Sequence, residues 1–321
     1  MYQTQINPTE INISDAFYTF TYNRISAILE QSIRTMGMLY PVILEELENH
    51  RYRIVSGSRR VNAAFRLSLP RIPAIIYTPD EKSPLQLFLI NLHENLSIRQ
   101  LNAIEKSRVL YKLRHEFKIP ENTIVETYMP LLQLVKNPKI LEMYLQFNQL
   151  EDEIQAAIVD DFIGLEMALK LLDFSRGNRE SFFRLAKRLR LGKNRQRELL
   201  NLLLDLSKRD DQTFSQIIDT GPIQEILVDE SIPTPLKAER VRHLFRTQRY
   251  PRFTEVERKF NNLMKQMKLP GTISITPFPY FEQSKFTMKV EFTDQDDFKG
   301  KLAFLQKLVA EGYISQLDDL S

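Results

Sequence analysis

The pattern of hydrophobic and polar positions changes twice along the chain. Up to about residue 100, short apolar runs alternate with longer helical patterns, which predicts a mixed domain of strands and helices. From 101 to 250, nearly every hydrophobic pattern has the spacing of three or four residues that is typical of helices. From 251 to 321, two alternating segments lie between two amphipathic ones. The chain is therefore predicted to be an α+β protein with three domains, 1–100, 101–250 and 251–321.

Within the first domain, three short apolar runs predict strands over 42–44, 52–55 and 72–77. The first two are predicted to pair across a turn near residues 49 and 50. A helix over 25–36 is predicted to end at Gly37, since glycine adopts the left-handed cap conformation at little cost. Another helix is predicted over 84–92. Three alternating aromatic residues predict an edge strand: Tyr18, Phe20 and Tyr22.

The third domain is predicted to be a small αββα module. Thr254 and Glu257 have the spacing of a capping box at the start of its first helix. The strands are predicted around 273–275 and 286–292, and the last helix over 295–310. Two strands and two helices bury little apolar surface, so we expect this module to pair with a second copy in a homodimer.

Composition narrows the class of protein. The chain has 321 residues, of which 43% are hydrophobic and 26% charged, as in folded globular proteins. Without a cysteine, it cannot form disulfides, thiolate metal sites or a cysteine nucleophile. We see no secretory signal and no apolar run that could span a membrane, so we expect a cytoplasmic location. The net charge is only +3, so binding of a polyanion requires local clusters of basic residues.

The segment 51–64 has the composition of a phosphate-binding turn. It predicts a strand, a turn at Gly57 and a helix that begins with Ser58, Arg59 and Arg60. Backbone N–H groups at a helix N-terminus carry partial positive charge and favour phosphate. Glycine allows close approach of a ligand, and guanidinium groups bind phosphate oxygens in pairs. The alternative is a solvated helix start in which both arginines form local ion pairs.

Three segments in order resemble the N-terminal domain of the ParB partition proteins: 32–42, 54–64 and 94–105. The resemblance covers about the first third of the chain and implies the fold shared by ParB and sulfiredoxin. The following helices, 123–134 and 138–150, resemble the family's central helix-turn-helix region more weakly. The resemblance implies a DNA-binding protein that is gated by a nucleotide, with CTP and Mg²⁺ as the expected ligands.

Carried over by position, the family's motifs imply a set of ligand-binding residues. Glu94 and Asn95 would hold Mg²⁺ through oxygen atoms, which suits a hard cation. The alternative is a helix C-terminus with Asn95 as its left-handed cap. Gly37 and Pro41 would shape the wall beside the base. The implied phosphate-binding residues are Gly57, Ser58, Arg59 and Arg60.

Two residues depart from the family's pattern. Ser58 stands where the family often has Glu or His, a change that we expect to be tolerated. The arginine that follows the Glu-Asn pair is displaced by one residue, to Arg99, and Ile98 takes its place. One residue corresponds to a rotation of about 100° around a helix. The contact of Arg99 with phosphate, the identity of the nucleotide and a weak CTPase-like activity are therefore left open.

A basic segment over 176–197 is the candidate for nucleic-acid binding. It has nine Lys or Arg residues and one acid, Glu180. The pattern predicts a helix, a turn at Gly192 and a second helix with Asn194 as its N-cap, as in a helix-turn-helix. The alternative is an αα-hairpin with a solvated cationic face. By contrast, 138–150 has only Lys139 as a basic residue and is interpreted as a packing helix. The candidate DNA-binding residues are Arg184, Lys187, Arg188, Lys193, Arg195 and Arg197.

Three functions remain open at this stage. The first is a ParB-like DNA-binding protein in chromosome partition, plasmid maintenance or transcription, with a nucleoid location and a partner ATPase implied by the resemblance. The second is a phosphotransferase or nuclease on the same fold, for which Glu94 is the candidate base. The third is a scaffold that has lost nucleotide binding. The three ordered motifs and the basic segment favour the first.

Overall fold

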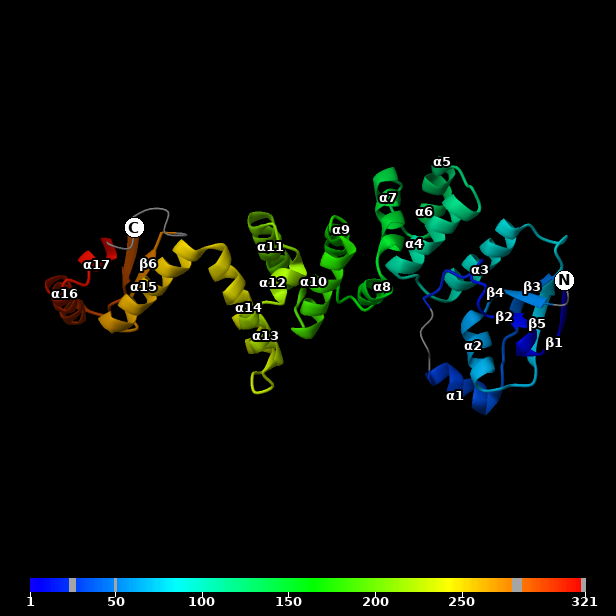
Figure 1. Ribbon diagram of the computed structural model, residues 1–321, viewed down its shortest axis with the longest axis horizontal. Helices are drawn as coiled ribbons and strands as arrows, with labels where there is room; N and C mark the ends of the chain where they lie inside the picture. Colours follow the sequence, from blue (N-terminus) through cyan, green and yellow to red (C-terminus); the bar gives the residue numbers. More distant parts are fainter. Residues whose placement is uncertain (23–26, 49–50, 279–284, 319–321) are drawn as a thin grey trace. The chain divides into compact units, whose positions relative to one another are not determined.

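The computed structural model describes residues 1–22, 27–48, 51–278 and 285–318. It divides into two compact units, 1–174 and 175–321 (Figure 1). The sheet, the first helices and α4 to α9 lie in the first unit. The division into three domains stays a prediction.

A five-stranded mixed sheet forms the centre of the N-terminal part (Figure 1). Its order is β1-β5-β3-β4-β2, so that β3 lies in the middle. β3 pairs antiparallel with β4 and parallel with β5, while β1 joins β5 antiparallel and β2 joins β4 in parallel. The strands are β1 Tyr2–Ile6, β2 Ile11–Asn12, β3 Val42–Leu47, β4 Arg51–Ser56 and β5 Ile72–Tyr77.

The three predicted strands are confirmed as the inner strands β3, β4 and β5. The two edge strands were not predicted, and the predicted edge strand around Tyr18 and Phe20 is wrong. Both of these side chains are fully buried, and the segment has no strand pairing. The alternating aromatic residues therefore lie on the buried side of an irregular segment, not on one face of a strand. The predicted turn near residues 49 and 50 lies outside the described residues.

Alternate apolar residues of the strands form the core with one face of α2, Ser58–Arg66. Val42, Leu44 and Ile76 are completely buried in it, as are Val61 and Ala64 of the helix. Both the period of two in the strands and the spacing of three in α2 are those expected for one face of each element. The core thereby fixes the position of the N-terminus of α2 at the end of β4.

Two further helices pack in this part of the chain, α1, Ala27–Met36, and α3, Pro84–Ile98. α1 ends at Gly37, whose φ of +74° confirms the predicted left-handed cap. α3 begins with a capping box between Ser83 and Gln86. It continues six residues beyond the predicted end at 92, to Ile98, so Glu94 and Asn95 lie within the helix. The interpretation of Asn95 as a left-handed cap is therefore wrong.

The rest of the first unit is helical, as predicted. Two segments, Lys112–Glu116 and Ile124–Tyr128, are π-helical, and Phe147–Gln149 is a 3₁₀ turn. The α-helices are α4 Ala103–Tyr111, α5 Glu121–Thr123, α6 Met129–Leu131, α7 Pro138–Gln146, α8 Asp152–Val159 and α9 Leu165–Leu172.

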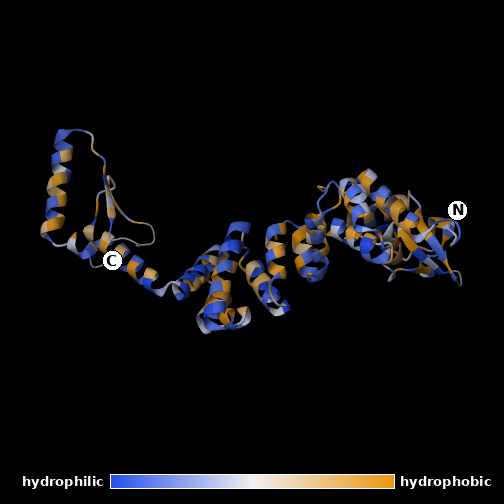
Figure 2. Ribbon diagram, turned by 90° about the horizontal axis from the view of Figure 1, so that it is seen from above, coloured by the Kyte–Doolittle hydropathy of each residue, from blue (hydrophilic) through white to orange (hydrophobic). Residues whose placement is uncertain are grey.

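The second unit begins with five helices and ends with a small mixed module. The five are α10 Arg176–Arg188, α11 Lys193–Asp210, α12 Phe214–Ile218, α13 Gly221–Val228 and α14 Thr234–Arg249. The module consists of α15 Pro251–Met267, β6 Ile273–Pro277, β7 Phe286–Val290, α16 Gln295–Ala310 and α17 Ser315–Asp318. β6 and β7 pair antiparallel. Hydrophobic and hydrophilic residues alternate along the helices of both units (Figure 2).

The predicted capping residues of two helices in this unit are wrong. α15 begins at Pro251 after the cap residue Tyr250, so Thr254 is inside the helix and its capping box is wrong. α11 begins at Lys193 after Gly192, so Asn194 is not its N-cap. None of the helices in the described parts of the chain is long and apolar enough to span a membrane.

Candidate nucleotide and nucleic-acid sites

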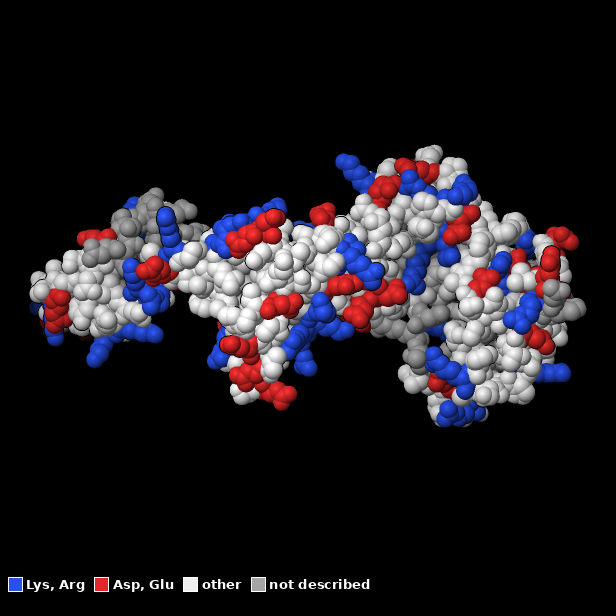
Figure 3. Space-filling view, viewed as in Figure 1, with Lys and Arg blue, Asp and Glu red and all other residues white. Residues whose placement is uncertain are grey.

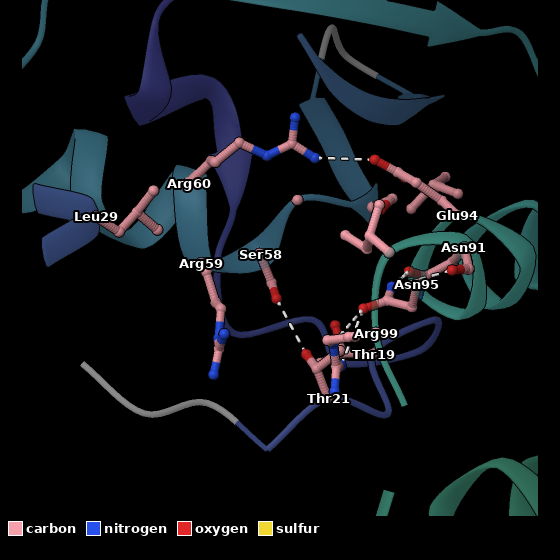
Figure 4. Close-up of a pocket in the computed structure, with 14 residues that line it drawn as sticks. Thr19, Thr21, Leu29, Ser58, Arg59, Arg60, Asn91, Glu94, Asn95 and Arg99 are labelled. Atoms are coloured by element: carbon pink, nitrogen blue, oxygen red, sulfur yellow. Dashed lines mark hydrogen bonds and ion pairs between the residues drawn. The ribbon is translucent and has the colours of Figure 1, made fainter. Parts of the chain in front are cut away.

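A cavity of about 220 Å³ lies between the start of α2, the last turns of α3 and the segment 19–21. The motifs that the sequence places far apart meet here (Figure 4). The cavity is lined by Thr19, Thr21, Leu29, Val55, Ser56, Gly57, Ser58, Arg59, Arg60, Asn91, Glu94, Asn95, Ile98 and Arg99.

The N-terminus of α2 opens on this cavity because Gly57 turns the chain sharply after β4. Gly57 has φ +96°, a conformation that residues with a side chain rarely adopt. A Cβ atom there would lie 3.0 Å from Val42 Cγ1 and 3.1 Å from an Arg60 nitrogen. No side chain caps the helix, and its first turn contains no acid. The backbone N–H groups and the positive end of the helix dipole are thus available to an anion.

The two adjacent arginines have different surroundings. Arg60 donates through Nη1 to the carbonyl oxygens of Tyr40 (3.1 Å) and Pro41 (2.7 Å), and through Nη2 to Glu94 Oε1 (3.1 Å). Arg59 is exposed, and its guanidinium points in a different direction from that of Arg60 (Figure 4). Arg60 therefore braces the wall of the cavity, whereas Arg59 offers its charge to a ligand.

The carboxylate of Glu94 has one atom with no partner. Its Oε1 accepts from Arg60, but Oε2 is buried and has no hydrogen-bond partner within the described chain. Such an atom carries a desolvation cost that a bound cation or donor would offset. Asn95 is less available, because its Oδ1 accepts from Arg99 Nε (3.2 Å) and Nη2 (3.0 Å). Its Nδ2 donates to the backbone and side-chain oxygens of Asn91.

Arg99 lines the cavity and is at the same time tied to α4. Its Nη1 and Nη2 donate to the two oxygens of Glu105 at 2.7 Å and 3.0 Å. Glu105 is 1% exposed and also accepts from the backbone N–H groups of Tyr22 and Asn102. Burial raises the pKa of Glu105, but the bonds from Arg99 and the two amides outweigh burial and hold the pKa below its ordinary value. The displaced arginine is thus a link between the cavity and the helical part of this unit.

The segment 19–21 was not recognised from the sequence as part of the site. Thr19 and Thr21 line the cavity, and the Thr21 hydroxyl lies 3.4 Å from that of Ser58. They alternate with the buried Tyr18 and Phe20, so the sequence pattern did indicate a segment with one polar and one buried side. It was assigned to a strand, whereas it marks a segment with one buried side and one side on the cavity.

The two residues expected beside the base are located differently. Neither Gly37 nor Pro41 lines the described cavity. Gly37 caps α1, and the carbonyl oxygen of Pro41 accepts from Arg60. Pro41 therefore acts on the cavity through Arg60.

A divalent cation fits this site only in part. Among the described residues, no group of three or more His, Cys, Asp or Glu side chains could hold a metal ion. Glu94 supplies one oxygen without a partner, while the oxygen of Asn95 is taken by Arg99. Magnesium commonly binds through one or two protein oxygens together with phosphate oxygens. The site is chemically suited to Mg²⁺ when phosphate is present as well.

The six candidate DNA-binding residues lie on α10 and at the start of α11, and all are exposed. Arg184 and Arg188 also line a second cavity, against α12 and α13, where Arg188 Nη2 donates to the carbonyl oxygen of Leu227 at 2.8 Å. Lys187 lies over the ring of Phe183. The other three, Lys193, Arg195 and Arg197, lie in the first turns of α11.

Comparison with known proteins defines the class of the first domain. Residues 4–96 match the family described as the ParB N-terminal domain. These residues include the five-stranded sheet except the first two residues of β1, and Gly57, Arg59, Arg60, Glu94 and Asn95 of the cavity. The N-terminal part of the protein, residues 4–96, is ParB-like.

Curated relatives match over the same part of the chain. The "Probable chromosome-partitioning protein ParB" of Vibrio cholerae is 28% identical over 127 residues, which are 40% of this chain and 40% of that protein. That of Neisseria meningitidis is 38% identical over 98 residues, 30% of this chain and 33% of that protein. The "Nucleoid occlusion protein" of Bacillus thuringiensis is 28% identical over 135 residues, 42% and 43% of the two chains. The chain thus spans about two fifths of the length of the relatives it matches.

Solved structures of similar proteins include two of truncated ParB from Caulobacter crescentus. One, complexed with CTP-gamma-S, has 20% identity and a TM-score of 0.27 over 55% of this chain and 94% of that chain. The other, complexed to the centromeric parS site, has 18% identity and a TM-score of 0.32 over 57% and 90%.

Proposed function

We propose that the protein binds DNA under the control of a nucleoside triphosphate, CTP with Mg²⁺, and acts in chromosome or plasmid partition or in transcription. The observation that carries the proposal is the meeting of two of the three sequence motifs, 54–64 and 94–105, at one cavity. This cavity also has a helix N-terminus, an exposed guanidinium and a carboxylate oxygen with no partner among the described residues.

Phosphate would lie at the start of α2. The backbone of Gly57 and Ser58 lines the cavity there, and Arg59 adds a charge that no acid in the first turn of the helix neutralises. Glu94 would hold Mg²⁺ together with phosphate oxygens. Asn95 would bind Mg²⁺ only if Arg99 no longer donated to the side-chain oxygen of Asn95. The cation supplies charge neutralisation for the triphosphate, and the protein's own groups fix the orientation of the chain of phosphates.

The basic residues of α10 and α11 would supply the DNA-binding surface. On the face seen in Figure 3, Lys and Arg side chains gather over the helices of the second unit, beside acidic groups. With a net charge of only +3, this local clustering matters more than the field of the whole molecule. The chromosome-partitioning and nucleoid occlusion roles of the relatives support the proposal that the polyanion is DNA.

A homodimer is the proposed working form. Phe298, Leu302 and Val309 of α16 are 41%, 45% and 62% exposed. They form an apolar stripe on a module whose core is small. A partner ATPase and a nucleoid location belong to the same proposal by resemblance.

DNA binding with and without nucleotide tests the function. Fluorescence anisotropy with a labelled duplex is measured over a series of salt concentrations, with Mg²⁺ and each of the four NTPs. We expect salt-dependent binding whose affinity or lifetime changes with CTP. Arg59→Ala should remove the effect of CTP and leave the salt dependence intact.

The outcome that contradicts the proposal is the lack of binding to any duplex at low salt with every nucleotide. If the chain binds DNA but no nucleotide changes this binding, the proposed DNA binding stands and the proposed control by a nucleotide is rejected. Lack of thermal stabilisation by all four NTPs would then favour the scaffold function.

A further inference from the structure

We propose that α11 is the helix that reads DNA bases, through Lys193, Asn194, Arg197 and Asn201. The inference rests on the proposed DNA binding and deepens it, because it separates base reading from phosphate contact. The reading helix would be the second helix of the α10–α11 pair, not α7.

The α10–α11 connection has the geometry of a helix-turn-helix. Four residues, 189–192, join the helices, and Arg190 takes the left-handed conformation with φ +49°. The N–H of Leu191 then donates back to the carbonyl oxygen of Ala186 at 3.0 Å. Ala186, Leu189 and Leu191 are buried around this turn. A short turn of this kind redirects the chain and fixes the start of the second helix.

The packing of the two helices excludes the αα-hairpin alternative. α10 packs mainly on α12, and α11 packs on α12 and α14. In an antiparallel hairpin, helices of this length would pack along each other instead. α10 and α11 therefore meet only near the turn, as in a helix-turn-helix.

One face of α11 is left open by this packing. Leu199, Leu202, Leu203 and Leu206 are buried, with Gln196 completely buried beside them. Lys193, Asn194, Arg197 and Asn201 are exposed. At 100° per residue, these four fall within one arc of about 100° on the side opposite to the leucines.

Two acidic residues at the edge of this arc form ion pairs with arginines of α14. Glu198 Oε1 accepts from Arg242 Nη1 at 3.1 Å, and Asp205 Oδ2 accepts from Arg249 Nε at 3.0 Å. Both carboxylates would repel phosphate if they faced the groove. Apart from these two paired acids, the exposed side chains of this arc are cations and amides.

This set of side chains suits the major groove of duplex DNA. Asn binds adenine and Arg or Lys binds guanine through paired hydrogen bonds to the base edge. The exposed polar residues of α7 offer less: Lys139, Gln146 and Glu142, whose carboxylate pairs with Arg114. With the paired acids of both helices set aside, α11 presents two amides and two cations in this arc, whereas α7 presents one of each.

The test compares sequence preference in matched variants of the full chain. A duplex is selected from a random pool with CTP and Mg²⁺, and its anisotropy is compared with that of a scrambled duplex. In the Asn194→Ala/Asn201→Ala double variant, we expect the affinity ratio of the two duplexes to fall by about fivefold or more, the loss expected for one paired base contact. Binding to the scrambled duplex and its salt dependence should not change, since both amides are uncharged. The control on α7, Lys139→Ala/Gln146→Ala, should keep the ratio.

The outcomes separate this inference from the proposed function. The inference is overturned if the affinity ratio of the two duplexes is unchanged in the α11 variant, or if it is lost in the α7 variant. A wild-type chain that binds duplexes without preference also overturns it and leaves DNA binding in place. A chain that binds no duplex rejects both. Unchanged melting temperatures confirm that the surface variants are folded.

Discussion

At the scale of single residues, two neighbours of the same type have different functions. Arg60 is held by two carbonyl oxygens and by Glu94, and it fixes the segment before β3 against α2 and α3. Arg59 is exposed at the cavity. Adjacent residues of a helix lie about 100° apart, so the two side chains leave α2 in different directions.

Arg59→Ala and Arg60→Ala should therefore differ. We expect Arg59→Ala to weaken CTP binding about 10- to 100-fold, the loss of a charge-assisted contact, with little change in stability. Arg60→Ala should lower the free energy of unfolding by ~1–2 kcal/mol and weaken binding indirectly. Titration calorimetry and urea unfolding measure the two effects. Equal stability losses in both variants would contradict this division of roles.

Gly57 is the second residue whose role depends on its conformation. Gly57→Ala should destabilise the protein by ~1–2 kcal/mol or more. A positive φ is unfavourable for alanine, and its Cβ would be in close contact with Val42 and Arg60. Gly192→Ala is the matched control, since Gly192 has negative φ and open space around it. Thermal unfolding of the two variants gives the comparison.

At the scale of elements, the junction between α3 and α4 links the cavity to the helical part of the first unit. Arg99 ends α3 and binds Glu105 in the first turn of α4. Glu105 also receives the N–H of Tyr22, next to the cavity segment, and Lys112 donates to the carbonyl oxygens of Ala16 and Phe17. A ligand that shifts segment 19–21 or Arg99 would thereby act on α4.

The pKa of Glu105 predicts how this junction depends on pH. Its pKa is lower in the folded protein than in the unfolded chain, so the carboxylate stabilises the fold above its ordinary pKa of about 4.5. This contribution is lost as the pH falls from there through the lower folded value. Glu105→Gln should cost ~2–3 kcal/mol at pH 7, and the difference from wild type should shrink below about pH 4. Urea unfolding from pH 7 to 3 measures it. A difference that does not vary with pH would reject the role of the charge.

The exposed stripe of α16 predicts the oligomeric state. Leu302→Glu should convert a dimer to a monomer, because a charge would be buried in the apolar contact. Ala303→Glu introduces the same charge about 100° around the helix and should leave the dimer intact. Light scattering after gel filtration distinguishes the two. A wild-type chain that is already monomeric would exclude the dimer.

At the scale of the whole molecule, the division into two units predicts a selective effect of the nucleotide. The cavity lies wholly within residues 1–174. A ligand at 100 times its Kd stabilises the unit that binds it by about 2.7 kcal/mol. Calorimetry with CTP and Mg²⁺ should therefore raise the unfolding transition of the first unit by several degrees. The transition of 175–321 should stay in place, and Arg59→Ala should abolish the shift.

Much of the fold was predictable because its signals are local. The inner strands, the cap at Gly37 and the helix start at Ser58 follow from apolar spacing and glycine conformation within a few residues. The edge strands β1 and β2 were missed, because edge pairing depends on partners about 40 to 70 residues away. The extension of α3 to Ile98 was missed because its last turn is stabilised by polar side-chain bonds of Asn95 to Asn91 and Arg99, which the apolar spacing does not indicate.

For the site, the sequence by itself determined which residue types could bind phosphate and the order of the three motifs that contain them. Only the tertiary structure decided that Arg60 is a brace and Arg59 is exposed, that Thr19 and Thr21 line the cavity, and that Arg99 donates to the side-chain oxygen of Asn95. The physical reason is that a spacing fixes the side of one helix or strand on which a residue lies. The partner that the residue meets there is set by elements from distant parts of the chain.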